Sequence, residues 1–162
     1  MHYSVVLQLL ALLALANGSP IVAKWIFDDR FALPLDGNKR FVDGRPLFGA
    51  SKTIRGIAAS LFVTSACAPL VGLSSGIGLL VASTAMAGDL LSSFLKRRLG
   101  LPSGSRATGL DQIPESLVPL LACRQLLSLT ALDIIAGTAV FLIGAVVLSQ
   151  LLFELHVRDR PY

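Results

Sequence analysis

The distribution of charged residues along the chain is the feature that most limits its fold. Long apolar runs with few charges alternate with short segments that hold most of them, and the runs cover about residues 4–27, 54–73, 76–95, 113–130 and 132–155. A helix needs about 20 mostly apolar residues to cross the hydrocarbon core of a bilayer. The sequence therefore predicts an all-α, polytopic transmembrane helix bundle with about five spans.

The composition agrees with a membrane protein. Hydrophobic residues make up 54% of the 162 residues and charged residues 15%, with a mean hydropathy of +0.72, whereas soluble domains average about 25% charged residues. The connections are too short for a second domain, so residues 1–162 are expected to form a single integral membrane domain. The net charge of +4 does not indicate nucleic acid, because the basic residues lie between the apolar runs.

The first apolar run contains the sequence Asn17-Gly18-Ser19-Pro20. A cleavable signal peptide is one explanation, with residues 7–16 as its apolar region. No Lys or Arg precedes that region, however, and apolar residues resume at Ile21. We therefore expect a retained helix with a break at residues 17–20.

The fourth run contains Pro114, Glu115, Pro119 and Arg124. Polar and helix-breaking residues at membrane depth are tolerated where the segment is buried in protein or lines a cavity. We expect this segment to be partly re-entrant or packed inside the bundle.

The basic residues predict the orientation, because cytoplasmic loops are enriched in Lys and Arg. They fall after the first run, after the third run and in the tail: Arg30, Lys39, Arg40, Arg45, Lys52, Arg55, Lys96, Arg97, Arg98, Arg106, Arg158 and Arg160. The opposite connections, near residues 72–75 and 128–131, hold none. This pattern predicts cytoplasmic loops at about 28–53 and 96–112, an outside amino terminus and an inside carboxyl terminus in a plasma membrane.

The loop before the second run is rich in turns and basic residues. It contains two Asp-Gly pairs, which are typical of turns. Lys52 and Arg55 then follow one helical turn apart at the start of the second run, where helix amides favour phosphate. A solvated loop that anchors to anionic lipid explains the same residues, and both explanations stay open.

Asp89 lies near the loop end of the third apolar run. A carboxylate at the centre of a membrane helix costs about 2.5–3.5 kcal/mol, and less near its end, so such residues are functional candidates. Ser92, Ser93 and Lys96 follow at helical spacings and can share its face. A purely structural Asp–Lys ion pair is the alternative.

A third polar group precedes and begins the fourth run. It consists of Asp111, Pro114 and Glu115. Helix capping alone explains these residues, with Asp111 as the cap and Glu115 at the positive end of the helix.

Together these motifs make the chain similar to the CDP-archaeol synthase family, which is related to the phosphatidate cytidylyltransferases. The resemblance covers nearly the whole chain. Its motifs are Asp36-Gly37 through Arg45, Phe48-Gly49, Lys52-Thr53, Arg55-Gly56, Gly88-Asp89 and Asp111-Gln112. In addition, Ser93-Phe94-Leu95-Lys96-Arg97 is similar to the opening of the cytidylyltransferase signature. The chain departs from that signature at residues 102–104 and 111–115. It also carries Ala50-Ser51 where archaeal members tend to have Asp-Gly.

The resemblance implies a membrane nucleotidyltransferase of phospholipid biosynthesis, which transfers CMP from CTP to a lipid phosphate and releases pyrophosphate. A lipid phosphate is already ionised, so the main difficulty is charge repulsion, which cations and Mg²⁺ relieve. Catalytic roles are expected for Asp89, Lys96 and Asp111, with Asp89 and Asp111 as Mg²⁺ ligands. The expected substrate-binding residues are Asn38, Arg40, Arg45, Lys52, Thr53, Arg55, Ser93 and Arg97.

Two other functions fit parts of the sequence. A phosphatidyltransferase would have several further Asp residues after Asp36-Gly37-Asn38-Lys39-Arg40, and no such Asp cluster follows at helical spacing. A transporter or lipid-binding scaffold would favour polar residues throughout the membrane depth, where only Arg124 and Asp133 qualify. The concentration of charge at one edge favours interfacial chemistry. Five short helices give limited lateral packing, which favours a homo-oligomer.

Overall fold

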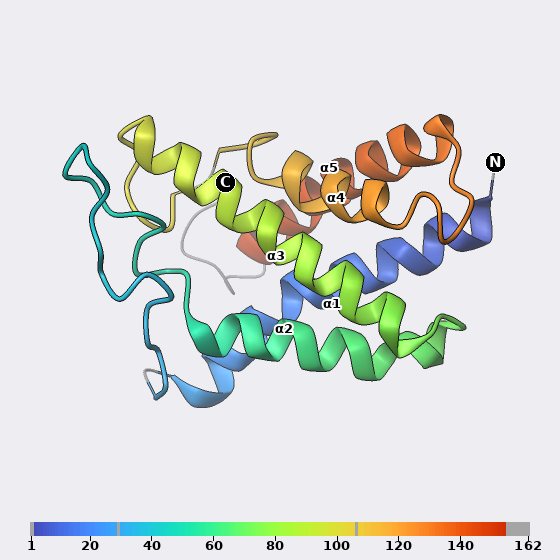
Figure 1. Ribbon diagram of the computed structural model, residues 1–162, viewed down its shortest axis with the longest axis horizontal. Helices are drawn as coiled ribbons and strands as arrows, with labels where there is room; N and C mark the ends of the chain where they lie inside the picture. The colour runs from blue at the N-terminus through green and yellow to red at the C-terminus, as the bar shows by residue number, and fades with distance from the viewer. Residues whose placement is uncertain (1, 29, 106, 155–162) are drawn as a thin grey trace.

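The computed structural model describes residues 2–28, 30–105 and 107–154, whose regular elements are helices joined by turns and loops, with no named strand (Figure 1). The elements are α1 (Tyr3–Phe27), α2 (Ile54–Cys67), the short 3-10 helix η1 (Ala68–Val71), α3 (Ser75–Arg98), α4 (Gln112–Ala122) and α5 (Ala131–Glu154). The prediction of an all-α membrane bundle is confirmed. Arg106, His156, Arg158 and Arg160 lie outside the described residues.

Four segments of the described chain are long and apolar enough to cross a bilayer: α1, α2 with η1, α3 and the first part of α5. The fourth apolar run is not one spanning helix, because α4 ends at Ala122 after 11 residues. Turns through residues 123–130 continue the path to α5. The prediction of a helix over residues 113–130 is wrong, and the alternative of a segment packed inside the bundle fits α4, whose Ser116, Pro119 and Leu120 are buried.

The chain passes back and forth between two ends of the bundle (Figure 1). The described residues of the segments 28–53 and 99–111 lie at one end, called the loop end below. At the opposite end, the backbone amide of His2 donates to Asp133 Oδ1 over 2.9 Å, so α1 and α5 begin side by side. Trp25 and Tyr3 are exposed near the two ends of α1, as expected for aromatic residues at membrane–water interfaces.

The predicted break at residues 17–20 is wrong, because α1 continues through Pro20. Proline has no N–H, so Pro20 cannot donate to the carbonyl of Ala16, which lies four residues earlier. Ser60 of α2 replaces the missing donor, and its hydroxyl lies 2.8 Å from Ala16 O. Neighbouring hydroxyl groups are one way in which a membrane helix tolerates proline.

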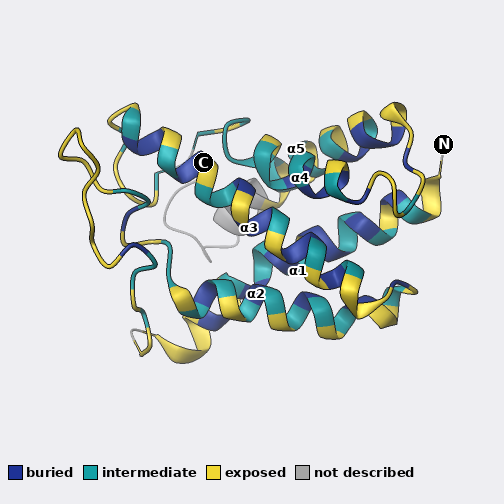
Figure 2. Cartoon of the chain, viewed as in Figure 1, coloured by how far each residue is buried: buried dark blue, intermediate teal, exposed yellow. Residues whose placement is uncertain are grey.

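The core lies between α1, α3 and α4, whereas the outward faces of the helices stay exposed (Figure 2). Leu12, Leu13 and Val81 are fully buried, but Phe62 on α2 is 76% exposed. Exposed apolar side chains of this kind are expected to contact lipid in a membrane bundle.

Asp36 organises the loop between α1 and α2. Its Oδ1 accepts the backbone N–H of Asn38, and its Oδ2 accepts those of Phe48 and Gly49, each at 3.0 Å. Burial alone would raise the pKa of the Asp36 carboxyl, but these hydrogen bonds outweigh it and hold the pKa below its ordinary value. The carboxylate therefore joins the two halves of the loop.

Arg98 fixes the same loop to the end of α3. Its guanidinium donates to Asp43 Oδ1 and to Pro46 O, both at 2.6 Å. It also lies 4.8 Å from the ring centroid of Phe41 and 4.9 Å from that of Phe94. Cation–π contacts of this kind favour Arg over Lys, and together these contacts hold the loop against the end of α3.

Candidate active site

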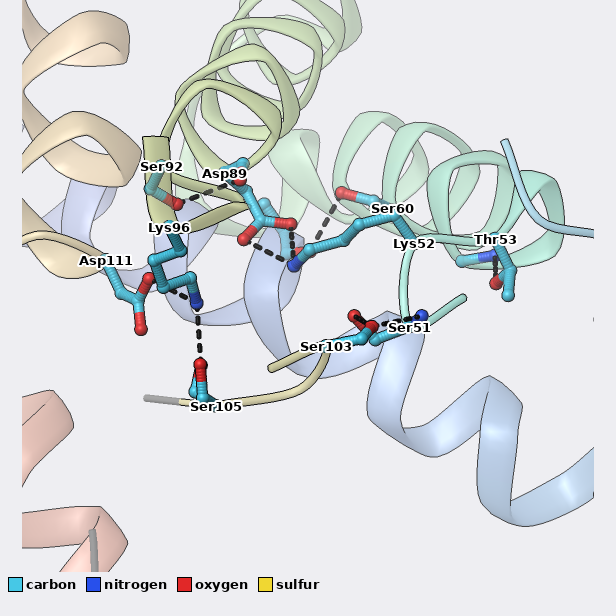
Figure 3. Close-up of polar contacts among 12 residues, drawn as sticks. Ser51, Lys52, Thr53, Ser60, Asp89, Ser92, Lys96, Ser103, Ser105 and Asp111 are labelled. Carbon is cyan, nitrogen blue, oxygen red and sulfur yellow. Dashed lines mark hydrogen bonds and ion pairs between the residues drawn. The ribbon is translucent and has the colours of Figure 1, made fainter. Parts of the chain in front are cut away.

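The first polar pair of the loop end joins α2 to α3 (Figure 3). Lys52 precedes α2, whose amino terminus is capped by Thr53 through a hydrogen bond from Gly56 N to Thr53 Oγ1 over 3.1 Å. The cap places Lys52 against Asp89 of α3, with its ammonium 2.6 Å from Oδ1 and 2.5 Å from Oδ2. Both side chains are mostly buried, with 22% and 16% exposure.

The second pair lies about two helical turns further along α3, because Lys96 follows Asp89 by seven residues. Lys96 Nζ is 2.7 Å from Asp111 Oδ1 and donates to Ser105 O over 2.8 Å. Asp111 Oδ2 accepts the N–H of Ala107 over 3.0 Å. The side chain of Asp111 makes no capping hydrogen bond to α4, so the capping explanation for this residue is wrong. Asp111 instead holds the loop 99–111 against Lys96.

Glu115 is a candidate that the sequence reasoning missed. Its carboxyl group lies beside that of Asp89 and within electrostatic range of Lys52 and Asp111. The close approach depends on Gly88, because a Cβ at that position would lie 2.3 Å from Pro114 O and 2.9 Å from Glu115 N. A sequence signal existed, since Glu115 follows Asp111 by four residues and shares its helix face.

Arg97 provides cationic hydrogen-bond donors without partners. Its side chain is only 4% exposed, and Nη2 donates to Pro102 O over 2.6 Å. Nε and Nη1 have no partner among the described residues, and neither does the buried hydroxyl of Ser93. Buried polar groups are almost always hydrogen-bonded, so these donors favour an anionic ligand. Gly49 lies against this group, because its Cβ would be 3.4 Å from Arg97 Nη1.

Arg55 follows Lys52 by three residues and lies in the first turn of α2. Its Nη1 donates to Asp28 O over 2.7 Å and to Arg30 O over 2.5 Å. Its Nε has no hydrogen-bond partner within the described chain. A cavity of about 360 Å³ opens between the loop ends of α1, α2 and α3, and Arg55 lines it together with Lys52 and Asp89.

The structure places the remaining sequence candidates in the loop itself. Asn38 is in a turn with φ of 61°, and Arg40 Nη1 donates to Gly44 O over 3.2 Å. Arg45 Nη1 reaches α3, where it donates to Arg98 O over 2.5 Å. The described contacts of these three residues therefore support the loop and its attachment to α3, and do not join them to the two lysine–aspartate pairs.

The chemistry of the donors suits a hard divalent cation. No group of three or more His, Cys, Asp or Glu side chains is arranged for metal binding in the part of the chain that the structure describes. Mg²⁺ does not need one, because it typically binds one or two carboxylates together with substrate phosphates and water. Asp89 and Glu115 place two carboxyl groups beside one ammonium, so the site has carboxylate oxygens for a cation.

Three comparisons with known proteins give the chain its family. A model of the CarS-like CDP-archaeol synthase family matches residues 68–162. The chain belongs to the CDP-archaeol synthase family. The predicted recognition is therefore confirmed, and Asp89, Lys96, Arg97, Asp111 and Glu115 all lie within the matched residues.

Relatives and a solved structure agree with this family membership. The chain is 39% identical over 104 residues to the CDP-archaeol synthase of Hyperthermus butylicus, with 60% of this chain and 59% of that protein aligned. It is 36% identical over 119 residues to that of Saccharolobus islandicus, with 68% of each aligned. A solved structure of an intramembrane enzyme for archaeal membrane lipid biosynthesis superposes with a TM-score of 0.73 at 32% identity, over 86% of this chain and 89% of that one.

Proposed function

We propose that this integral membrane protein transfers CMP from CTP to a lipid phosphate, giving a CDP-lipid and pyrophosphate. A phosphate oxygen of the lipid attacks the α-phosphorus of CTP and forms a new P–O bond. The bond from that phosphorus to the bridging oxygen of the β-phosphate breaks, and its electron pair leaves with pyrophosphate. The lipid phosphate is already ionised near neutral pH, so the step needs no strong general base.

The observation that carries the proposal is the cluster of cationic donors around carboxylates at one end of an apolar bundle. Lys52 and Lys96 are each fixed by an aspartate, and Arg97 keeps two buried nitrogen atoms without described partners. A polyanionic triphosphate needs several preorganised cations, and a site in a low-dielectric bundle strengthens their effect. Lys52, Lys96 and Arg97 are assigned to the phosphates.

The proposed resident cation is Mg²⁺, held by Asp89 with Glu115 and Asp111 nearby. When bound, Mg²⁺ neutralises phosphate charge and favours the departure of pyrophosphate. The protein's own side chains position the reactants: each aspartate orients one lysine, and the Gly88 contact keeps Glu115 beside Asp89. Thr53 and Ser93 are proposed to assist substrate binding, and Asn38, Arg40 and Arg45 to act through the loop.

The loop end is proposed to face the cytoplasm of a plasma membrane. The support is the positive-inside rule, because the basic residues between α1 and α2 and at the end of α3 share this end. CTP would then enter from the cytoplasm, while the lipid phosphate arrives within the bilayer. We expect a single-cysteine label in the loop, for example at Ser51, to react only when reagent reaches the cytoplasmic side.

The test is pyrophosphate release by the detergent-purified protein with CTP, MgCl₂ and a panel of ether-linked and ester-linked lipid phosphates. We expect pyrophosphate release to require one class of lipid phosphate and to stop when a chelator removes Mg²⁺. The rate of release should fall at least about 100-fold in Asp89→Asn, which is the effect of losing one transition-state contact. If the folded protein binds CTP and lipid but releases no pyrophosphate under any condition, the proposed enzyme activity is refuted. The protein would then be a lipid-binding protein or a transporter. Retained turnover in Asp89→Asn would refute the site.

A further inference from the structure

Gly49 lies where the loop before α2 meets the loop after α3. It is buried, and its φ of 95° falls in the left-handed region that favours glycine. A Cβ at this position would lie 2.6 Å from Ser103 Oγ and 3.4 Å from Arg97 Nη1. Both the backbone conformation and the contact therefore require a glycine, and the two loops pack directly on each other there.

On the side of the first loop, Gly49 sets the position of Lys52, the cation of the first lysine–aspartate pair. The backbone amide of Gly49 donates to Asp36 Oδ2 over 3.0 Å. Its carbonyl accepts the backbone N–H of Lys52 over 3.1 Å. Because the Lys52 ammonium holds Asp89, a displacement of Gly49 would be transmitted to that pair.

On the side of the second loop, Ser103 lies between two residues whose carbonyls are held by the second group of cations, Lys96 and Arg97. Arg97 Nη2 donates to Pro102 O over 2.6 Å. Lys96 Nζ donates to Ser105 O over 2.8 Å. A ligand that draws either cation toward itself would therefore displace this segment and, with it, the serine that touches the first loop.

Ser51 adds a polar contact to the same crossing of the two loops (Figure 3). Its backbone amide donates to Ser103 Oγ over 3.4 Å, and the Ser103 hydroxyl donates to Ser51 Oγ over 3.3 Å. The crossing thus has a steric part at Gly49 and a polar part at Ser51, the residue directly before Lys52. Both parts involve the same serine of the second loop.

We propose that the Gly49–Ser103 contact couples the two groups of cations, so that an anionic ligand bound at one group strengthens the binding of an anionic ligand at the other. Gly49 is a positioning residue, because it acts through Lys52 and Arg97. The inference rests on the proposed function, in which CTP and a lipid phosphate bind together at the loop end. Two anions placed side by side repel each other. Electrostatics alone therefore predicts that each substrate weakens the binding of the other, and the proposed coupling has the opposite sign.

The test measures this coupling without turnover. The probe is the α,β-methylene analogue of CTP with MgCl₂, which cannot release pyrophosphate because a carbon atom replaces the bridging oxygen that would leave. Its Kd is measured by equilibrium binding with and without a saturating lipid phosphate, in the ether-linked and the ester-linked form. With the accepted lipid phosphate present, the wild-type protein should bind the analogue at least about fivefold more tightly, at the lower end of the usual coupling between two sites.

Three variants relate the coupling to the contact. In Gly49→Ala the ratio of the two Kd values should fall to about one, the value without coupling, because the new methyl group displaces Ser103. Adding Ser103→Gly removes the atoms that this methyl group meets, so the double variant should recover most of the ratio. The matched control is Gly44→Ala in the same loop, where φ is 75° but a Cβ meets no atom within 4 Å. Its backbone is strained in the same way, and its ratio should stay at the wild-type value.

The outcomes separate the coupling from the proposed function. A wild-type ratio of about one or less would overturn the coupling, even for a protein that releases pyrophosphate from CTP. Equal losses in Gly44→Ala and Gly49→Ala would assign the effect to strain in the loop and overturn the role of the contact. If Gly49→Ala does not fold, Ser103→Val enlarges the same contact from the other loop and should also lower the ratio. A protein that shows the coupling but transfers CMP to no lipid phosphate would refute the proposed function and leave the coupling in place.

Discussion

The two ends of the bundle use the same kinds of charged residues to different effect. At the opposite end, Asp133 is fully buried and accepts hydrogen bonds from the backbone of His2 and from both the backbone and hydroxyl of Thr130. At the loop end, Asp89 and Asp111 are also paired, but neighbouring cations keep donors without described partners. Satisfied polar groups stabilise a fold, whereas surplus donors beside a cavity mark a site for a ligand.

The largest expected effect separates the two ends by activity. Glu115→Gln keeps the shape of the side chain but replaces the carboxyl group beside Asp89 with an amide, so kcat should fall about 100-fold with little change in folding. Asp133→Asn should leave kcat of the folded protein unchanged. The measurement is initial velocity of pyrophosphate release, normalised to the folded fraction from size-exclusion chromatography. A normal kcat in Glu115→Gln would show that Asp89 acts without it.

The second prediction uses two glycines of one helix. A Cβ at Gly88 would lie 2.3 Å from Pro114 O, and one at Gly78 would lie 2.6 Å from the Cβ of Ala68. Overpacking at either should cost about 1–3 kcal/mol and lower the Tm. Only Gly88→Ala also moves α4 away from Asp89, so only this variant should lose kcat. Equal kcat losses in both would mean that general loosening of α3, and not the Asp89–Glu115 contact, limits the rate.

The sequence predicted the elements better than their contacts. The spans near residues 54–73 and 76–95 follow from hydropathy, because each residue contributes independently to the mean hydropathy of its run. The contacts of Asp89 do not follow in this way, since Lys52 approaches it from 37 residues away. Glu115 was missed because its place near a helix start already had a sufficient electrostatic explanation. Pro20 predicted a break in the helix because the sequence does not show that Ser60, 40 residues later, supplies the hydrogen-bond donor that proline lacks.

The third prediction concerns stability at the opposite end. Asp133 and Thr130 form a reciprocal contact at the start of α5, in which Asp133 N also donates to Thr130 Oγ1 over 3.2 Å, the arrangement of a capping box. Asp133→Ala should lower the Tm clearly, because it leaves the amides of His2 and Thr130 without their acceptor. Thermal melts in detergent test this, with Lys39→Ala at an exposed loop position as the comparison. An unchanged Tm would show that lipid or water replaces the carboxylate.

The smallest expected effect lies between the two ends, at Ser60. Ser60→Ala removes the donor to Ala16 O and should cost about 1 kcal/mol, the typical net value of one hydrogen bond or slightly more for a buried group. Activity should not change, because this contact belongs to neither end. The measurement is the free energy of unfolding by denaturant titration in mixed micelles.

A double-mutant cycle with Pro20→Ala tests the reason for that cost. Alanine at position 20 restores the N–H that can bond to Ala16 O within α1, so the hydroxyl of Ser60 is no longer the necessary donor. Ser60→Ala should then cost less in the Pro20→Ala background than in the wild type, and the difference measures the coupling. Additive effects would mean that Ser60 stabilises the α1–α2 contact by packing alone, and that the Ala16 carbonyl tolerates the proline without help.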